Sequence, residues 1–435
     1  MRRYICKGIA ILAILLVAVP IRAQFLMDMI DTTKELGKTT FQTIDRLNHI
    51  RISGYIQPQF QWTNGKGSSN YSGGNFAPNA NSRFMLRRGR IRFDYVRTDE
   101  NHRNQLQFVF QFDGTERGVA IRDFWGRYWE NKFEVFAFTG GMFARPFGFE
   151  VNLSSADREA PERGRMSQIL MRTERDLGFM VSVEKRKQGK AWKFFRIDLG
   201  IFNGQGLTAT GEFDSYKDLI TQLVIKPQQI AKNLYLSGGV SMLYGGLEKT
   251  GKVSYEMGEI NGTPHFLKDS VNIKTGGELP RHYYGVNAQL RYRTEWGNSE
   301  LRGEFWKGTQ TGTQTSSETP SSIPALTPMY VRPFNGAFIV FLQHIVNPRN
   351  QIGIKLDWYD PNTKTAGTTL GSAGSNFTDA DVKYTTLGMG YIRYVNENLK
   401  LVCWYDLIRN EKTALAGYTA DKKDNVLTIR AQFRF

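Results

Sequence analysis

The chain ends in Asn425-Val426-Leu427-Thr428-Ile429-Arg430-Ala431-Gln432-Phe433-Arg434-Phe435, a stretch in which polarity alternates residue by residue. Apolar side chains occupy every second position and polar or charged side chains the positions between them. Alternation with a period of two predicts a β-strand with one apolar and one polar face. A barrel strand that faces lipid on one side and water on the other requires this pattern, whereas the alternative is an edge strand of a soluble sheet.

The beginning of the chain has the features of an export signal. Arg2, Arg3 and Lys7 precede an apolar run over residues 9–19, and Ala23 offers a small residue before Gln24. We therefore expect residues 1–23 to form a signal peptide. No later segment reaches the roughly 18 uninterrupted apolar residues that a spanning helix needs. Export without such a helix leaves the periplasm, the exterior or the outer membrane as destinations.

The composition favours the membrane among these destinations. Hydrophobic residues make up 40% of the chain, yet aromatic residues reach 13%, which suits the aromatic girdles of a transmembrane barrel. Cys6 would leave with the signal peptide and Cys403 would remain alone. The mature chain is therefore expected to contain no disulfide and no cysteine metal site within one subunit, and we expect no metal or other cofactor.

The formal charge of the whole chain is +16, and four of the basic residues lie in the expected signal peptide, which leaves +12. A basic protein raises the question of a nucleic-acid partner. The arginines are scattered along alternating segments and form neither a run nor a helix face. We therefore expect no nucleic-acid partner.

From Arg51 onward the chain divides into sixteen segments of alternating polarity, each long enough to cross a bilayer as a tilted strand. The expected strands are 51–62, 83–97, 103–113, 119–129, 132–143, 176–187, 191–203, 217–227, 233–244, 282–294, 298–309, 335–346, 350–360, 382–395, 398–409 and 424–435. An even number of antiparallel strands can close into a ring, and only a closed ring leaves no unpaired backbone in hydrocarbon. Sixteen strands enclose an aqueous channel.

The connections alternate between short and long. Glu130-Asn131 and Asn396-Glu397 are examples of short ones, and the long ones are 63–82, 144–175, 245–281, 310–334 and 361–381. Outer-membrane barrels have short periplasmic turns and long external loops. The sequence therefore predicts an all-β, sixteen-stranded antiparallel transmembrane barrel over residues 51–435. Residues 24–50 are expected to form either a short amphipathic periplasmic helix or a mobile leader.

The alternation also assigns side chains to the channel. Ile91, Phe93 and Tyr95 point to lipid, so Arg88, Arg90 and Arg92 should form an inward ladder. An arginine on the lipid face costs about 2–4 kcal/mol near the bilayer midplane. Further inward cations are expected at Arg196, Arg291, Arg293, Arg302, Arg430, Arg434 and Lys355, and inward acids at Asp94, Asp113, Glu134, Glu184, Asp198, Glu304 and Asp357. A net positive channel would attract anions, whereas a mutually neutralised wall would not select.

One segment resembles a known family. Gly140-Gly141-Met142-Phe143-Ala144-Arg145-Pro146-Phe147-Gly148-Phe149-Glu150 is similar to the signature that ends the fifth strand of the phosphate-selective porin O/P family. The stretches Gly54–Phe60 and Gly200–Gly204 and the arginine-rich second strand are similar in order and spacing. The resemblance covers most of residues 51–435.

Membership of that family would imply a homotrimeric outer-membrane porin whose third external loop folds into the channel and sets its constriction. Here that loop is 144–175, and it adds Arg145, Arg163, Arg165 and Arg172 to the candidate anion-binding residues. The loop contains six basic and five acidic residues and has Ala144 where a basic residue is common. This departure weakens the expectation of phosphate specificity but not that of a porin.

The sequence thus predicts a porin in the outer-membrane lipid that lets small hydrophilic, preferentially anionic, phosphate-like solutes diffuse passively. A non-selective general porin is one alternative. A plugged barrel that serves as a receptor or adhesin through loops such as 245–281 and 310–334 is another. We do not expect an enzyme, because the five histidines are dispersed and none lies near a Gly-x-Ser-x-Gly nucleophile motif.

Overall fold

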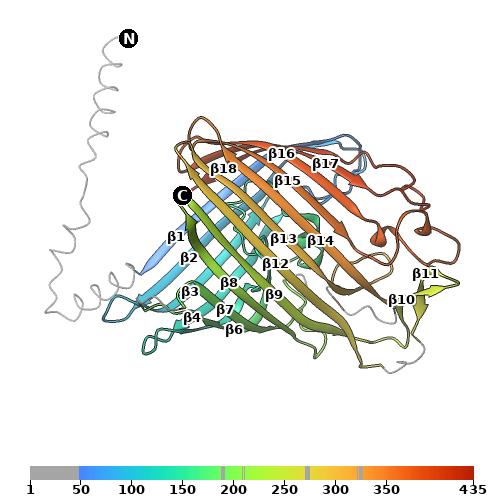
Figure 1. Cartoon of the computed structure of the whole chain (residues 1–435), viewed down its shortest axis with the longest axis horizontal. Coiled ribbons are helices and arrows are strands. Elements are labelled where there is room, and N and C mark those ends of the chain that lie inside the picture. Colours follow the sequence, from blue (N-terminus) through green and yellow to red (C-terminus); the bar gives the residue numbers. More distant parts are fainter. Residues whose placement is uncertain are drawn as a thin grey trace, which may run out of the picture. The chain divides into compact units, whose positions relative to one another are not determined.

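The computed structural model of the chain describes residues 49–187, 192–207, 209, 211–269, 275–320, 322 and 327–435 (Figure 1). The expected signal peptide lies outside the described residues, as does the 24–50 segment apart from its last two residues. No helix in the described part of the chain is long and apolar enough to cross a membrane.

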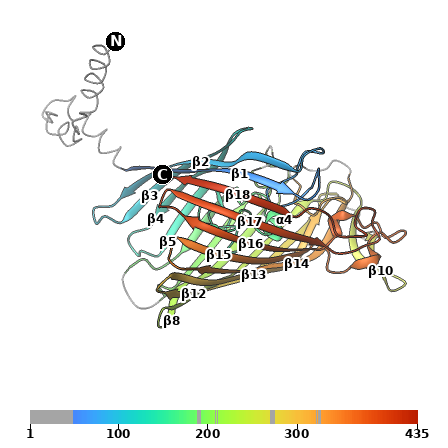
Figure 2. The ribbon, with the colours of Figure 1, turned by 90° about the horizontal axis from the view of Figure 1, so that it is seen from above.

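Sixteen strands form a closed antiparallel ring, as the sequence predicted. They are β1 (Ile50–Thr63), β2 (Ser82–Thr98), β3 (Asn104–Thr115), β4 (Gly118–Trp129), β5 (Phe136–Ala144), β6 (Arg175–Val183), β7 (Phe195–Phe202), β8 (Asp218–Ala231), β9 (Leu234–Glu248), β12 (Glu278–Thr294), β13 (Gly297–Gly312), β14 (Met329–His344), β15 (Asn350–Asp360), β16 (Tyr384–Tyr394), β17 (Leu399–Asn410) and β18 (Val426–Arg434). Consecutive strands pair, β9 pairs with β12, and β18 pairs with β1 to close the ring. The strands cross the wall obliquely, as ring closure requires (Figures 1 and 2).

The closing pair shows how the alternation places side chains. Ile56 lies opposite Phe433 and Gln59 lies opposite Arg430 in the register between β1 and β18. Because opposite residues share a face of the sheet, Ile56 and Phe433 point outward together, and Gln59 and Arg430 point inward together. Apart from Gln57 and Pro58, the register pairs each position from Tyr55 to Thr63 with β18, so the ring has no open edge here, as a barrel in hydrocarbon needs.

Burial in this barrel is the reverse of that in a soluble protein. Ile52, Ile56 and Ile429 are 56%, 45% and 50% exposed, whereas Gln57 and Arg430 are 1% and 3% exposed. Soluble proteins bury aliphatic side chains and expose glutamine and arginine. The outer apolar belt is therefore suited to acyl chains, and the assignment of faces along these two strands is confirmed.

Several strand limits differ from the expected ones. The strand expected at 335–346 begins at Met329, because its hydrogen-bonded ladder with β13 continues beyond the belt, where alternation is no longer needed. The strand expected at 132–143 begins only at Phe136. The prediction that Glu134 faces the lumen is therefore wrong. Glu134 has a φ of 58° in the turn before β5 and pairs there with Arg103 at 2.5 Å.

The connections follow the expected pattern with one exception. Glu116-Arg117 joins β3 to β4 by a tight hairpin at the end of the barrel where the other connections are long. The long connection between β9 and β12 contains a hairpin that the sequence did not predict, β10 (Ser254–Ile260) with β11 (Thr263–Lys268). Its first residues pair in parallel with the start of β14. This hairpin extends the wall outward and is not part of the ring.

Candidate functional site

The connection between β5 and β6, residues 145–174, folds into the barrel and is called the inward segment below. It contains one short helix, α4 (Arg165–Leu170). The backbone N–H groups of Phe149 and Glu150 donate to Glu304 of β13 at 2.8 and 2.9 Å, and Lys400 of β17 donates to the carbonyl of Ala156 at 2.7 Å. Strands far apart in the ring therefore hold the same segment.

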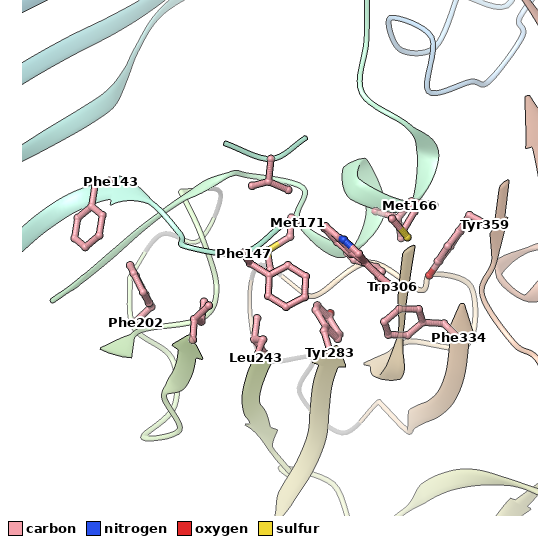
Figure 3. Close-up of a cluster of buried hydrophobic side chains, with 14 of the residues drawn as sticks. Phe143, Phe147, Met166, Met171, Phe202, Leu243, Tyr283, Trp306, Phe334 and Tyr359 are labelled. Atoms are coloured by element: carbon pink, nitrogen blue, oxygen red, sulfur yellow. The ribbon is translucent and has the colours of Figure 1, made fainter. Parts of the chain in front are cut away.

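An apolar cluster fixes the inward segment to one side of the wall (Figure 3). Its members from the segment include Phe147, Met166 and Met171. The wall contributes one residue from each of β5 to β9 and β12 to β15: Phe143, Met180, Phe202, Ile220, Leu243, Tyr283, Trp306, Phe334 and Tyr359. Phe147 packs edge-on against Trp306 with ring centroids 4.7 Å apart. Apolar packing thus fills this side of the lumen, where the sequence predicted a water-lined wall.

Ion pairs fix the inward segment to the opposite side of the wall. Glu162 lies 2.9 Å from Arg87 and 2.8 Å from each of Arg88 and Arg430. Burial opposes ionisation of this carboxyl, but the surrounding guanidinium groups hold the pKa of Glu162 well below its usual range. Glu159 pairs at 2.9 Å with Arg302 of β13, the strand that also contributes Trp306 to the apolar cluster. Arginines of the wall therefore neutralise both Glu162 and Glu159.

The open space of the lumen lies mainly between the inward segment and the end of the barrel with short turns. Three cavities there measure about 690, 290 and 250 Å³, and Asn152 lines all of them. We call their combined space the inner vestibule. On the other side of the segment, a cavity of about 20 Å³ is lined by Tyr71, Arg165 and Asp357, among others. The inward segment thus separates a large inner space from a small outer one.

The expected arginine ladder lies on one wall, but its members have different surroundings. Arg88 is buried against Glu162, and Arg90 donates to Asp113 at 3.0 Å and to Ser155 of the inward segment at 2.9 Å. Arg92 is half-buried, pairs with Asp94 at 2.6 Å and lines the inner vestibule. Arg88 and Arg90 therefore hold the segment, whereas Arg92 makes no ion pair or hydrogen bond with the described residues of the segment; both Arg90 and Arg92 line cavities of the inner vestibule.

The four candidate arginines of the inward segment mostly form contacts in the outer half of the lumen. Arg145 is buried and donates to the carbonyl of Thr173 at 2.6 Å, and burial lowers the pKa of Arg145. Arg163 donates to the carbonyl of Ser167 at 3.0 Å. The Arg165 guanidinium lies 3.5 Å from the ring centroid of Tyr384, and Arg172 pairs with Glu318 at 3.0 Å. The structure does not gather these four around one space.

The three remaining candidates line the inner vestibule, each beside a carboxylate. Arg196 lies 2.9 Å from Asp198, and Arg291 lies 2.8 Å from Glu300. Arg302 lies between Glu300 and Glu159.

The sequence interpretation missed a group on β4. Arg127 lies between two inward tryptophans, 5.4 Å from the ring of Trp125 and 5.9 Å from that of Trp129. Its Nε donates to Thr139 at 2.7 Å, and no carboxylate of the described residues forms an ion pair with it. Alternation places Asp123 on the same inward face, and this signal was present in the sequence. The register with β3 shifts between Gln111 and Phe112, so Arg122 is an extra residue in β4 and the alternation of faces changes there.

No protein-family model matches the chain, and no curated protein matches it. Solved structures do. The outer membrane channel DcaP of Acinetobacter baumannii is similar with a TM-score of 0.54 and 11% identity, over 89% of this chain and 97% of that one. OprB of Pseudomonas putida is similar with a TM-score of 0.54 and 12% identity, over 93% and 98%. The chain therefore has the fold of these proteins.

Proposed function

We propose that the protein is an outer-membrane porin through which small hydrophilic, preferentially anionic solutes diffuse passively. The charge of the inner vestibule is the observation that carries this proposal. Its three cavities are lined by six carboxylates, Asp123, Asp157, Glu174, Glu184, Asp198 and Glu300, against thirteen cations, Arg90, Arg92, Arg122, Arg127, Arg158, Arg175, Arg186, Arg196, Lys226, Arg291, Arg293, Arg302 and Arg434. A pore with cations in excess lowers the electrostatic barrier for anions.

Four of these cations, Arg127, Arg158, Arg186 and Arg293, have no carboxylate in ion-pair distance among the described residues. Arg158 is almost fully buried, and Arg186 donates to the carbonyls of Phe136 and Glu130, which leaves Arg127 and Arg293 as the cations most available to a solute. A guanidinium group without a carboxylate partner keeps its full attraction for a passing anion, and its planar fork suits oxyanions such as phosphate or carboxylate. The anion preference is therefore assigned first to Arg127 and Arg293, and second to Arg92, which pairs with Asp94 but is half-buried and lines the vestibule.

The inward segment would act as the constriction, because it separates the inner vestibule from the small outer cavity. The outer apolar belt supports an outer-membrane location, and DcaP is described as an outer membrane channel. The likeness to phosphate-selective porins in Gly140–Glu150 supports a homotrimer and phosphate-like permeants. The constriction, the outer-membrane location, the trimer and the phosphate-like permeants are all parts of the proposal.

A second function is favoured by a specific observation. The apolar cluster around Phe147 and Trp306 fills part of the lumen, and the outer cavity measures only about 20 Å³. A barrel plugged in this way would serve as a receptor or adhesin through its long loops.

Planar-bilayer recording of the purified full-length protein separates the two. A porin gives steady conductance in KCl. In a KCl gradient, a porin that prefers anions gives a reversal potential with the same sign as the chloride equilibrium potential. A plugged barrel gives no steady conductance, and a cation-signed reversal potential would contradict the assigned preference. Replacing chloride by phosphate in the same experiment ranks the two anions.

A further inference from the structure

The cavity of about 290 Å³ between the inward segment and the wall has an unusual charge. Six arginines line it, Arg90, Arg92, Arg122, Arg158, Arg175 and Arg434, but only one carboxylate, Glu174. We call it the Arg158 cavity. β1, β2, β3, β4, β6 and β18 contribute to its wall, and the inward segment covers it on the opposite side.

Five of the six arginines have an acidic partner. Arg90, Arg92, Arg175 and Arg434 pair with Asp113, Asp94, Asp123 and Asp157, and Arg122 pairs with Glu174. Arg158 is different: its guanidinium group makes no ion pair and no hydrogen bond to any described residue. Its side chain is nonetheless enclosed, since Arg158 is only 6% exposed and its Nε and Nη1 atoms are buried without an acceptor.

A second arginine in this cavity also has a buried donor without an acceptor. The Nε atom of Arg122 is also buried without an acceptor, although its Nη2 donates to Glu174 at 2.9 Å. Unsatisfied buried donors are rare in folded proteins and costly, more so when they carry charge. Burial and the neighbouring Arg88 guanidinium lower the pKa of Arg158 to about 9, although the charges of Glu162 and Glu150 oppose this shift.

The backbone around Arg158 is fixed, so its side chain cannot easily escape the cavity. The N–H of Arg158 donates to the carbonyl of Ser154 at 3.0 Å, and its own carbonyl accepts from Lys400 at 3.1 Å. Ser155 is bound to Tyr55 at 2.6 Å and accepts from Arg90 at 2.9 Å. The donors are therefore held in position before any ligand arrives, which reduces the entropy lost on binding.

We propose that the Arg158 cavity holds a resident tetrahedral oxyanion of the sulfate or phosphate class, which accepts hydrogen bonds from Arg158 and Arg122 and ties the inward segment to the wall. A tetrahedral oxyanion has enough acceptor oxygens to bind two guanidinium groups at once. Such an ion is part of the folded lumen and differs from a passing solute, because the buried donors need a partner whether or not solutes flow. The inference rests on the proposed function only for the anion's route of entry.

Isothermal titration calorimetry on the full-length protein in detergent tests the site. The protein is first exchanged into chloride buffer, and sodium sulfate and sodium phosphate are then titrated at constant ionic strength. We expect one saturable site per chain for at least one of the two oxyanions, and binding on the order of tenfold weaker or more in Arg158→Gln. Arg117→Gln is the matched control, because the Arg117 side chain is 83% exposed on the β3–β4 hairpin.

Hydrogen exchange supplies a readout that does not depend on permeation. The bound oxyanion should slow exchange over the inward segment in the wild type but not in Arg158→Gln. Arg158→Lys, which keeps the charge but not the fork, should bind with intermediate affinity and serves if the glutamine variant fails to fold. No saturable heat with either oxyanion, or equal binding by wild type and Arg158→Gln, would overturn the proposal and leave water as the occupant.

The two proposals fail separately. Oxyanion binding without conductance would remove the porin but keep the site. Anion-selective conductance without saturable binding would keep the porin and remove the resident ion.

Discussion

The Glu162 carboxylate of the inward segment lies 2.8 Å from the guanidinium group of Arg88, in the row of arginines on β2. Arg87 and Arg430 reach the same carboxylate. Arg88, which was predicted from the sequence to attract anions, thus holds the segment in place. We therefore assign the attraction of solutes to the arginines that line the inner vestibule, between the segment and the short turns.

Replacing Glu162 by glutamine should loosen the inward segment. Breaking a buried ion pair by removing one partner costs about 3–5 kcal/mol, because the other charge stays buried without compensation. We expect a noisier and larger single-channel conductance and a reversal potential shifted further toward chloride. Glu116→Gln, on the exposed β3–β4 hairpin, should change neither.

The same pair predicts an acid-resistant constriction. The pKa of Glu162 is lowered in the folded protein, so the stability that it contributes is complete above its unfolded pKa near 4.5 and is lost only as pH falls through the lower folded value. Wild-type conductance noise should therefore be the same at pH 7 and pH 5. Noise that already rises at pH 5.5 would show that Glu162 does not hold the segment.

Arg127 and Arg293 should determine the anion preference. Each unit charge about 8 Å from an ion in water contributes about 0.5 kcal/mol, which is roughly a twofold change in local anion concentration. We expect Arg127→Gln and Arg293→Gln each to move the reversal potential in a KCl gradient toward cations, and the double variant to move it further. Arg117→Gln, which removes an equal charge outside the vestibule, should leave it unchanged.

Gly148 should tolerate no side chain. Its φ is 67°, and a Cβ there would lie 2.1 Å from Oε1 of Glu304, the oxygen that also accepts from Trp306 at 2.7 Å. Gly148→Ala should displace Glu304, release the start of the inward segment and raise the mean single-channel conductance. Gly164→Ala is the matched control, since Gly164 has a φ of −59° and its Cβ would meet no atom closer than 3.5 Å. Equal conductance of both variants would contradict this role of Gly148.

The barrel was predictable because lipid imposes a strict rule on the sequence. Every spanning strand must present an apolar side chain at each second position, so the faces of Ile56, Gln57 and Arg430 follow from parity alone. The rule stops where the membrane stops, and the start of β14 at Met329 was accordingly missed. The β10–β11 hairpin was missed for the same reason.

The interior was less predictable, because its contacts join residues far apart in the chain. Parity placed Arg88 inward, but nothing in the sequence pairs it with Glu162 of the inward segment. A helix of six residues such as α4 leaves no periodic signal, so the helix itself was not predicted, and only the family resemblance indicated that its loop enters the channel. That Arg158 lacks a partner becomes apparent only when its neighbouring acids have been assigned, Glu162 to Arg88 and Arg430 and Glu150 to Lys355.

Asp424, in the connection between β17 and β18, should make that loop more stable in mild acid. Both carboxylate oxygens are buried without a partner, and burial, with the charge of Asp421 nearby, raises the pKa of Asp424 to about 6 despite the opposing Arg165. A raised acid pKa means that the folded state binds the proton more tightly, so stability falls as pH rises from about 4 through about 6. Hydrogen exchange over residues 411–425, corrected for intrinsic rate, should be slower at pH 5 than at pH 7.5. Asp424→Asn should remove this difference, and its persistence would contradict the assignment.

Cys403 offers a direct test of which face of the wall meets lipid. It lies on β17 opposite Tyr391 and Ile429, which point outward and are 41% and 50% exposed. The free thiol is itself exposed on that face. A nitroxide attached there in the reconstituted protein should collide often with dissolved oxygen, which concentrates in hydrocarbon, and rarely with a water-soluble nickel chelate.

The matched control is a nitroxide at Asn376→Cys in a Cys403→Ala background, on the exposed loop between β15 and β16, where the nickel chelate should dominate. Low accessibility to both reagents at Cys403 would place a subunit contact on β17. Nickel collisions that equal those at position 376 would put the apolar face in water, and the transmembrane orientation of the wall would then be wrong.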